Sequence, residues 1–498
     1  MILHSGVGSI LRIKKHPIID FKSQKKISFY FNNKKLDGFE GDTIASALHA
    51  AGVKILTTSL KYNRPRGFFC GIGKCSSCLI RVNDVPNVRT CIAPLMEDIN
   101  VKMQNKLPDL PDAEFKCSAK QTIEVDILVV GAGPAGLCAA IEGAKQGAKM
   151  LLVDENQCVG GQLVKQTHKF FGSKNERAGT RGIEIAKELE NELKEFEKSN
   201  KIKLMLDSTV IGYYEGDEKK QHKFGVVKRE NYESKLYELN CKAVVFACGA
   251  MENMLLFPGN DLPGVYGAGA VQTLMNVYGV KPGERVIMIG AGNVGLIVSY
   301  QLLQAGIAVD RVVEAAPNIG GYHVHAAKLR RCGVPIQTSH SIKEVYGDEK
   351  VKGAVVVKLD QNWQPIKGSE EKVSCDTVCL AVGLTPSIRL LSQMGVYLEF
   401  ITEAGGYVAL HDNFMQTSVK GVYVAGDSSG IEEASTAMIE GKIAGLSAAI
   451  LLGHKKNQNL LKQYVNELDQ LRAGPFGEKP RIAKEKITKL MEKRHARI

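Results

Sequence analysis

Four cysteines near the N-terminus have a spacing that suits an iron–sulfur cluster. They follow the pattern C-x4-C-x2-C-x12-C and are Cys70, Cys75, Cys78 and Cys91. The first three lie in the segment RPRGFFCGIGKCSSC, and C-x4-C-x2-C followed by a distant cysteine is the plant-type [2Fe–2S] spacing. Each iron requires a tetrahedral set of sulfurs, so two thiolates must reach each iron from a tightly wound loop. Gly71 and Gly73 would let this loop fold back and turn its amide N–H groups toward the sulfurs.

Other uses of these cysteines are a zinc site, a redox-active disulfide or four unrelated buried thiols. Zinc sites usually pair two C-x2–4-C knuckles, and only Cys75 and Cys78 form one here. A lone C-x-x-C can be a redox disulfide, but the two further cysteines argue against that use. We therefore predict a [2Fe–2S] cluster, whose negative charge Arg64, Arg66 and Lys74 would stabilise.

A second segment has the glycine spacing of a dinucleotide-binding turn. In VDILVVGAGPAGLCAAIEGAKQGAKMLLVDE a buried strand leads into G-x-G-x-x-G, a helix follows, and the next strand ends in two acidic residues. The glycines allow a tight turn, the approach of a pyrophosphate and close packing of helix on strand, and the pyrophosphate would bind the helix N-terminus. The predicted site residues are Gly131, Gly133, Pro134, Ala135, Gly136, Asp154, Glu155, Gly161 and Gln162.

An acidic residue at the end of the second strand would hydrogen-bond the ribose hydroxyls of the bound nucleotide. The strand register favours Asp154 for this role, and Glu155 is the alternative. A glycine-rich turn that binds nothing remains the structural alternative for the whole segment.

The dinucleotide fingerprint occurs a second time, in ERVIMIGAGNVGLIVSYQLLQAGIAVDRVVEAAP. A carboxylate at the end of its second strand favours a free 2′-hydroxyl, and hence NAD over NADP. The alternative is a fold that packs but binds no nucleotide. The predicted residues of this second site are Gly290, Gly292, Asn293, Gly295, Glu314 and Gly383.

Composition limits the class of protein. With 498 residues the chain is too long for one compact core, and 44% hydrophobic with 24% charged residues excludes general disorder. The formal net charge of +12 is spread thinly except in the C-terminal tail, so we do not expect nucleic-acid binding.

Residues 286–309 lack charges, but their amides and glycines indicate a buried strand, turn and helix instead of a membrane span. With no signal peptide pattern, we expect a cytoplasmic location, where twelve cysteines would not form a disulfide framework.

The pattern of elements predicts an α/β protein with two Rossmann-like folds preceded by a β-grasp domain. A strand at 27–32, an Asn32-Asn33 turn and a helix beginning at Asp42-Thr43 open the β-grasp domain. The predicted organisation is an arm at 1–22, the [2Fe–2S] domain at 23–105, a linker at 106–122, a first nucleotide-binding domain at 123–265 and 390–455, a second at 266–389, and a basic helical tail at 456–498.

From Val125 to about Gly453 the chain resembles the flavoprotein reductases that have two dinucleotide folds, of the disulfide-reductase type. AVVFACGAMEN, with Gly249, and VCLAVGLTP resemble the strand–glycine links between the two folds of such proteins. The stretch FACGAMEN…FPGNDLPGVYGAGAVQ, with the leading RPRGFFCGIGKCSSC domain, is similar to the α subunit of heteromeric amine and imino-acid dehydrogenases. That group includes dye-linked proline dehydrogenase, opine and hydroxyproline dehydrogenases and heterotetrameric sarcosine oxidase.

The resemblance implies cofactors and partners. In flavoproteins of this type an aspartate following VYVAG, here Asp427 after Gly426, holds the ribityl chain of the flavin. FAD is therefore expected in the first pocket, although some members of the group hold ATP or NAD there. A separate β subunit of the glycine/sarcosine-oxidase-like family, with its own FAD, oxidises the substrate, and several members hold FMN at the α/β interface.

The chain departs from that group in one respect. Many members carry a second cysteine cluster in a C-terminal ferredoxin-like domain, whereas Cys379 is the last cysteine here. Such a centre would then lie on another chain, for example a small ferredoxin-like subunit of a hetero-oligomer. A disulfide-reductase role is not supported, because C-x-x-C occurs only in the cluster loop.

Three functions follow from these features. The favoured one is an electron-transferring α subunit of an amino- or imino-acid dehydrogenase complex; the alternatives are a stand-alone NAD(P)H-dependent FAD/[2Fe–2S] oxidoreductase and a scaffold whose nucleotides are structural. The sequence singles out no catalytic acid, base or nucleophile. We interpret His323 and His325 as ordinary surface or strand histidines and Cys248 as a small buried apolar residue.

Overall fold

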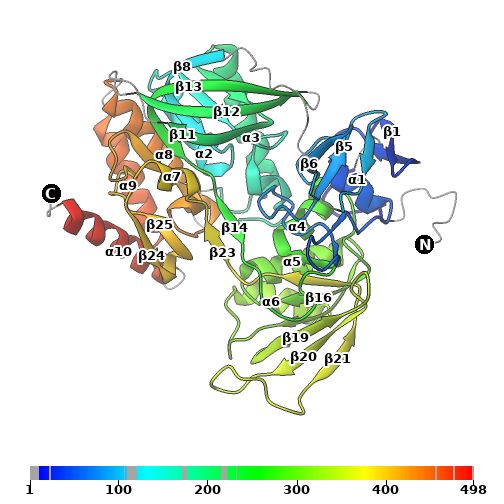
Figure 1. Cartoon of the computed structure of the whole chain (residues 1–498). Helices are drawn as coiled ribbons and strands as arrows, with labels where there is room; N and C mark the ends of the chain where they lie inside the picture. Colours follow the sequence, from blue (N-terminus) through cyan, green and yellow to red (C-terminus); the bar gives the residue numbers. More distant parts are fainter. Residues whose placement is uncertain are drawn as a thin grey trace. The chain divides into compact units, whose positions relative to one another are not determined.

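The computed structural model describes residues 11–21, 24–105, 107–108, 121–170, 177–214, 221–230, 233–454, 457–474 and 477–495. The chain divides into two compact units, one formed by Met1–Asp112 with Glu252–Gly383 and the other by Ala113–Met251 with Leu384–Ile498 (Figure 1). The chain leaves the second unit for the first after Met251 and returns to it after Gly383. Both points come before the limits of 265 and 389 that we predicted from the sequence. Each unit is described by itself.

The first unit begins with the expected β-grasp domain. Its sheet has the order β2-β1-β7-β5-β6, with β1 and β2 antiparallel and β1 and β7 parallel. Asn32 and Asn33 both have positive φ, 47° and 64°, as a two-residue hairpin turn requires. The elements are β1 (Lys26–Phe31), β2 (Lys34–Phe39), α1 (Ile44–Ala50), β3 (Thr57–Thr58), β4 (Pro65–Arg66), β5 (Leu79–Val82), β6 (Val85–Arg89) and β7 (Asn100–Lys102).

Helix α1 begins where the sequence predicted. Thr43 is its N-cap and accepts a hydrogen bond from the Ser46 amide, while the Ser46 hydroxyl accepts one from the Thr43 amide. Every residue of α1 is buried. The helix is enclosed because the sheet lies on one side and residues of the second nucleotide fold on another; the His49 ring contacts the Pro282 carbonyl oxygen at 3.2 Å.

The first unit continues with the second Rossmann-like fold, built on the parallel sheet β15-β22-β16-β17-β18. The uncharged stretch 286–309 forms most of β16, then α5 and the start of β17, as predicted, and a three-stranded antiparallel sheet follows. The elements are β15 (Val265–Gly267), α4 (Ala268–Gln272), η2 (Thr273–Val277), β16 (Arg285–Ile289), α5 (Asn293–Gln304), β17 (Ala308–Val313), α6 (His323–Arg331), β18 (Ile336–Gln337), β19 (His340–Tyr346), β20 (Gly353–Lys358), β21 (Glu371–Ser374) and β22 (Thr377–Leu380).

The second unit contains the first Rossmann-like fold. Its sheet has the order β10-β9-β8-β13-β12-β11, and the last residues of β13 also pair with β26. Strand β8 begins at Gln121, two residues inside the segment predicted as a linker. The elements are β8 (Gln121–Val130), α2 (Pro134–Lys145), β9 (Met150–Val153), η1 (Gly161–Lys165), α3 (Gly182–Lys198), β10 (Ile202–Met205), β11 (Ser208–Tyr214), β12 (His222–Glu230), β13 (Glu233–Phe246), β14 (Ala250–Glu252), β23 (Leu384–Pro386), α7 (Arg389–Gln393), β24 (Leu398–Ile401), η3 (Thr402–Ala404), β25 (Gly406–Ala409), β26 (Val422–Val424), η4 (Gly426–Ser429) and α8 (Ala434–Leu451).

Helices α2 and α8 cross at very short distance on one face of this sheet. A methyl group at Gly441 would lie 2.1 Å from the carbonyl oxygen of Ala135, and one at Gly445 would lie 2.2 Å from that of Ala139. Only glycine allows two helix backbones to approach so closely. This crossing brings the N-terminus of α2 beside the segment that precedes α8.

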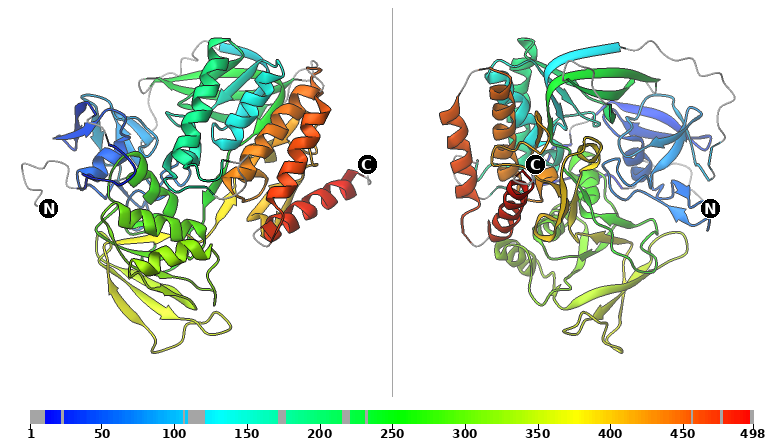
Figure 2. Two further views of the ribbon diagram at one scale, coloured as in Figure 1. Left: turned by 180° about the vertical axis from the view of Figure 1, so that it is seen from behind. Right: turned by 60° about the vertical axis from the view of Figure 1, so that its left-hand side comes forward.

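The predicted helical tail consists of α9 (Gln458–Leu471) and α10 (Glu478–His495). Figure 2 shows α9 running beside α8, and Leu461 and Leu468 of α9 belong to the same buried cluster as α2 and α8. Helix α10 packs on the hairpin of β24 and β25, where Ala483 and Ile487 lie against the hairpin's buried side chains. Within the described residues, no helix is long and apolar enough to cross a membrane.

Candidate functional site

The cysteine loop is folded as a tight cradle. Gly71, Gly73 and Ser76 have positive φ of 65°, 71° and 58°, so the backbone reverses repeatedly over six residues. Three of its amides point at sulfur atoms: those of Ile72, Gly73 and Ser77 lie 3.5, 3.2 and 3.5 Å from the Sγ atoms of Cys70, Cys91 and Cys75, respectively. These donors are of the kind that stabilises cluster sulfurs.

The four thiols lie in contact with one another. Cys70 interacts with Cys75 and Cys91, and Cys78 interacts with Cys91. Hydrogen bonds from the Cys75 and Cys91 thiols lower the pKa of Cys70, and the same contacts raise the pKa of Cys75 and Cys91, so these thiols titrate as one coupled set. In the part of the chain that the structure describes, no group of three or more His, Cys, Asp or Glu side chains is arranged to hold a metal ion. The thiol pairs, of which only Cys75 is half-buried, and their amide donors are of the kind that a [2Fe–2S] cluster uses.

The cluster loop also packs on the second nucleotide fold, within the same unit. The Gly267 amide donates to the Phe69 carbonyl oxygen at 3.1 Å, and a methyl group at Gly71 would lie 3.3 Å from Cα of Ala270. Arg64 and Arg66, which we expected to stabilise the cluster, approach the Asp261 carboxylate at 3.7 and 3.2 Å. Their observed ion pairs connect the β-grasp domain to the second fold, a role that the sequence did not predict.

The first fingerprint turn has the geometry that its glycines predict. Gly131 has φ of 105°, and a methyl group there would lie 2.3 Å from the Ala247 carbonyl oxygen. Gly133 caps α2, and Pro134 is the first helical residue, so the free amides of the first turn face the loop. A methyl group at Gly136 would lie 1.7 Å from the Gly131 carbonyl oxygen.

Asp154 is the acidic residue that contacts this turn. Its Oδ2 accepts a hydrogen bond from the Ala132 amide at 2.6 Å, and its Oδ1 accepts two from Asn156, both at 2.8 Å. Burial raises the pKa of Asp154. Glu155 is half-buried beside it, and Gly161 lies directly against Gly133, where an added methyl group would be 2.7 Å from the Gly133 Cα atom. Gln162 is exposed.

Three further predicted residues lie at the same turn. Gly426 has φ of 67°, and a methyl group on it would lie 2.9 Å from Cβ of Ala135 in the fingerprint helix. Gly249 faces open space, and its carbonyl oxygen accepts a hydrogen bond from Ser428 at 3.1 Å. Asp427 is half-buried, and its Oδ1 accepts a hydrogen bond from the Glu432 amide at 3.4 Å. The fold thus gathers the residues predicted to hold the first nucleotide.

The second fingerprint repeats the first in detail. Gly290 has the same φ of 105°, and a methyl group at Gly295 would lie 2.0 Å from the Gly290 carbonyl oxygen. Glu314 corresponds to Asp154, accepting hydrogen bonds from Ala291 at 2.7 Å and Ala316 at 2.9 Å. Gly292 caps α5 and faces open space.

Other residues complete the second site. The Asn293 side chain accepts a hydrogen bond from the Tyr322 amide at 2.8 Å, and Gly383 has φ of 104°. Gly321 takes the place that Gly161 has in the first fold, since an added methyl group would lie 2.8 Å from the Asn293 amide nitrogen. We did not predict Gly321 as a site residue, although the repeated Gly-Gly pair after each second strand was a visible signal.

The histidines that the sequence marked as ordinary are in a helix. His323 begins α6 and is exposed, whereas His325 is buried, stacks on Tyr322, and has a pKa lowered by burial. We expected surface or strand histidines; His323 is at the surface, and both lie in a helix because Tyr322 caps α6 at His323. Cys248 is half-buried, with its Sγ 3.7 Å from the Val130 carbonyl oxygen.

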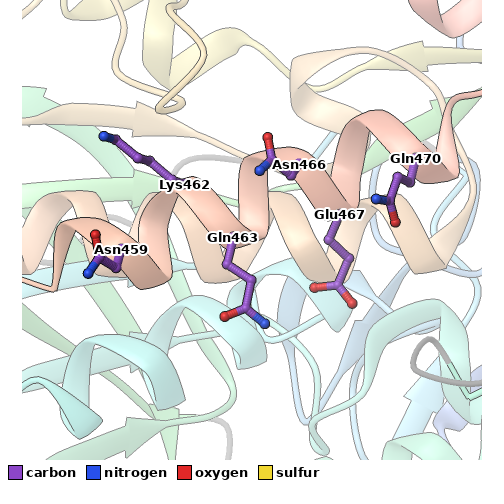
Figure 3. Close-up of a pocket in the computed structure, with 6 residues that line it drawn as sticks. All are labelled: Asn459, Lys462, Gln463, Asn466, Glu467 and Gln470. Atoms are coloured by element: carbon purple, nitrogen blue, oxygen red, sulfur yellow. The ribbon is translucent and has the colours of Figure 1, made fainter.

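One surface hollow lies along α9 and shares no residue with either fingerprint turn (Figure 3). Its lining consists only of amide and charged side chains from that helix. They are Asn459, Lys462, Gln463, Asn466, Glu467 and Gln470. We assign no role to this hollow.

Asp427 gives the first site a pH dependence that can be measured on the nucleotide-free chain. Burial, with the nearby carboxylates of Glu440 and Glu432, raises the pKa of Asp427 from 3.8 to about 7. Asp427 therefore contributes fully to the free energy of unfolding below about pH 4, and this contribution is lost as the pH rises through 7. Asp427→Asn should be more stable than wild type by on the order of 1–3 kcal/mol at pH 8 and equal to it near pH 4, in urea unfolding. Asp469→Asn, exposed on α9, is the control, and parallel curves for wild type and Asp427→Asn would contradict the assignment.

Two protein-family profiles match the chain, each over a different region. The profile described as Pyridine nucleotide-disulphide oxidoreductase matches residues 125–441, and that of a 2Fe-2S iron-sulfur cluster binding domain matches residues 24–106. The order of domains is thus the one expected from the sequence.

Individual relatives extend the comparison. The alpha subunit of sarcosine oxidase from Rhizobium meliloti (strain 1021) is 26% identical over 87% of this chain and 46% of the relative. The corresponding opine oxidase polypeptide of Agrobacterium tumefaciens (strain Ach5), its A subunit, is 29% identical over 65% of each chain. The solved L-proline dehydrogenase of P. horikoshii shares the fold with a TM-score of 0.68 and 24% identity, over 92% of this chain and 79% of that chain. The chain spans less than half the length of the sarcosine oxidase polypeptides that it matches.

Proposed function

The chain belongs to the pyridine nucleotide-disulphide oxidoreductase family, and from this membership we propose that it is the electron-transferring α subunit of a heteromeric amino- or imino-acid dehydrogenase. Its substrate class would be that of proline, hydroxyproline, sarcosine or opines. The relatives named as subunits of sarcosine and opine oxidases support this proposal, as does the 2Fe-2S domain that precedes the oxidoreductase domain.

The observation that carries the proposal is the presence on one chain of a formed cysteine cradle and two formed nucleotide turns. The cradle fits a [2Fe–2S] cluster because Cys70, Cys75, Cys78 and Cys91 are in mutual contact and receive amide hydrogen bonds. The first turn fits an adenine dinucleotide because open space lies at Gly249 and next to Gly133, in front of the α2 N-terminus. A bound flavin exchanges two electrons at once and releases them singly to a one-electron centre, which is the chemistry such a chain needs.

The chain's own residues would bind and orient the groups. The free amides at the start of α2 would bind the pyrophosphate, and the remaining lone pairs of Asp154 would accept ribose hydroxyls. Asp427 would hold the ribityl chain if the first nucleotide is FAD. ATP or NAD would use the same amides and Asp154 but leave Asp427 without that partner, so FAD is the proposed occupant and ATP or NAD the alternative.

We further propose the partners that the complex requires. A β subunit of the glycine/sarcosine-oxidase-like family, with its own FAD, would oxidise the C–N bond. FMN would bind at the interface, and a small ferredoxin-like subunit would supply a further centre. NAD would be the occupant of the second turn, where Glu314 stands in the place of Asp154.

The proposal predicts a division of labour that can be measured. The purified chain should show iron–sulfur absorbance, yet it should not reduce a dye with proline, hydroxyproline, sarcosine or an opine, because the substrate-oxidising site lies on the partner. Adding a β subunit of the glycine/sarcosine-oxidase-like family that forms a complex with it should restore turnover with one of these substrates. Robust turnover by the chain alone would refute the proposal.

A second candidate function rests on the complete geometry of the second turn. A stand-alone NAD(P)H-dependent FAD/[2Fe–2S] oxidoreductase would use Gly290, Gly292 and Glu314 to bind the reductant. Anaerobic NADH should then bleach the flavin within seconds. An α subunit that receives electrons from a partner should show slow bleaching or none.

A further inference from the structure

The basic C-terminal tail brings two cations to a buried cluster of carboxylates. The side chains of Arg472, at the end of α9, and Lys484, on α10, are 9% and 11% exposed. Both approach Glu432 and Glu440, which lie between the Gly426–Asp427 turn and the middle of α8. All of these residues belong to the second unit, and Figure 2 shows α8, α9 and α10 in two views.

The Arg472 guanidinium bridges the two carboxylates. Its Nε and Nη2 donate to the two carboxylate oxygens of Glu432 at 2.9 and 2.7 Å, and Nη2 also donates to Oε1 of Glu440 at 2.6 Å. A planar guanidinium fits this arrangement because it presents several N–H donors in a fixed geometry. Arg472 is thereby held in one orientation.

Lys484 connects the same carboxylate to the turn. Its Nζ lies 2.8 Å from Oε1 of Glu440, and it donates to the carbonyl oxygen of Ser429 at 2.9 Å and to the Ser429 hydroxyl at 2.7 Å. The ammonium group thus donates its three hydrogen bonds to Ser429, the last residue of η4, and to Glu440.

Glu440 connects the two cations to the turn at Gly426 and Asp427. Its second oxygen, Oε2, accepts hydrogen bonds from the Gly426 amide at 2.9 Å and from the Ser429 hydroxyl at 2.7 Å. Gly426 in turn lies against Ala135, at the start of the fingerprint helix. A continuous set of contacts therefore runs from the tail through one carboxylate to the first nucleotide site.

Simple anchoring of the tail does not explain these ion pairs. Ala483, Ile487 and Met491 already bury the apolar face of α10 on the β24–β25 hairpin. Buried ion pairs add little net stability, but removing one partner leaves an uncompensated charge. Without the cations, the carboxylates of Glu432 and Glu440 would face each other and Asp427 in a buried site. Both cations also lie beyond residue 441, where the family match ends.

We propose that the C-terminal tail is a positioning element of the first nucleotide site, in which Arg472 and Lys484 hold the Gly426–Asp427 turn through Glu440. Arg472 and Lys484 are positioning residues, since they contact the turn and its carboxylates and not the reacting groups. This inference rests on the proposed nucleotide function of that site. By this inference, retention of the nucleotide depends on the C-terminal tail, which lies outside the matched family domain.

Lys484→Met tests the inference, with Lys486→Met as the matched control. Lys486 lies on the same helix and forms an exposed ion pair with Glu403 at 2.7 Å. We expect Lys484→Met to speed amide hydrogen exchange at residues 426–429 roughly tenfold. Its affinity for added FAD or ATP should fall by roughly tenfold as well, because one charge-assisted hydrogen bond is lost. Iron–sulfur absorbance should be unchanged in both variants, because the cluster lies in the other unit.

Two further variants keep the test decisive if Lys484→Met does not fold. Lys484→Arg retains the charge and should retain exchange protection and nucleotide, whereas Glu440→Gln removes the shared charge and should lose both. Equal exchange rates and equal retention in wild type and Lys484→Met would overturn the inference, as would equal losses in Lys484→Arg and Lys484→Met. A wild-type chain that retains neither FAD nor ATP nor NAD would instead refute the proposed nucleotide site, and the inference with it.

Discussion

Replacing Cys91 by serine is expected to remove the iron–sulfur cluster and leave both nucleotide sites intact. Cys91 is the proposed ligand most distant in sequence, and it is 3% exposed, contacts Cys70 and Cys78, and accepts a hydrogen bond from the Gly73 amide. A serine oxygen is a poor replacement, because iron–sulfur clusters are held by cysteine thiolates. Iron and sulfide per chain should therefore fall from about two each to near zero, with loss of the visible absorbance.

The functional consequence distinguishes an electron-transfer role from a scaffold role. In the proposed complex with a flavin-containing partner, Cys91→Ser should abolish electron transfer to the acceptor while substrate still reduces the partner's flavin. Cys332→Ser is the control, because Cys332 is an exposed thiol outside the loop. If Cys91→Ser kept its iron, the fourth ligand would be misassigned. If it lost iron but transferred electrons normally, the cluster would be structural.

Local sequence patterns predicted the parts of the molecule in which backbone geometry demands a residue type. Gly131 and Gly290 have positive φ, and Gly136 and Gly295 allow close contact, so the type and spacing of these residues carry the information. The cysteine loop is similar, since Cys70, Cys75 and Cys78 lie within nine residues at the plant-type spacing. These features depend on contacts between near neighbours, which is why a single sequence reveals them.

The supporting contacts were not predictable, because they join distant segments without a fixed spacing. Nothing in the sequence around Glu440 indicates that Arg472 and Lys484 will meet it. Likewise, Asp261 shows no local signal that it will bind Arg66. Such pairs are decided by the packing of whole elements, here α9 and α10 on one unit and the β-grasp domain on the second fold.

The net charge of +12 has a partial explanation in the same contacts. Several tail cations pair with acidic residues of their own unit: Arg472 and Lys484 with Glu440, Lys486 with Glu403, and Arg494 with Glu399. These four cations therefore have partners within the fold of the second unit.

Gly133→Ala and Gly292→Ala form a matched pair that should each abolish one nucleotide site without unfolding the chain. Both glycines have ordinary negative φ, −75° and −72°, and cap the helix of their own fingerprint. A methyl group at Gly133 would meet only the Gly161 Cα atom, at 4.0 Å, and one at Gly292 would meet no atom within 4 Å. The space that alanine would fill is the space through which a pyrophosphate approaches the backbone.

We therefore expect Gly133→Ala to lose the nucleotide of the first site by at least about tenfold in affinity, with little change in the nucleotide-free unfolding midpoint. Gly292→Ala should spare that nucleotide and weaken NAD binding instead. The compounds released on denaturing each purified variant, identified by chromatography, would show whether the first site holds FAD, ATP or NAD. Gly136→Ala provides the contrast, because its methyl group would lie 1.7 Å from the Gly131 carbonyl oxygen and should destabilise the fold itself. Wild-type nucleotide content in Gly133→Ala would show that the first fingerprint is not the binding site.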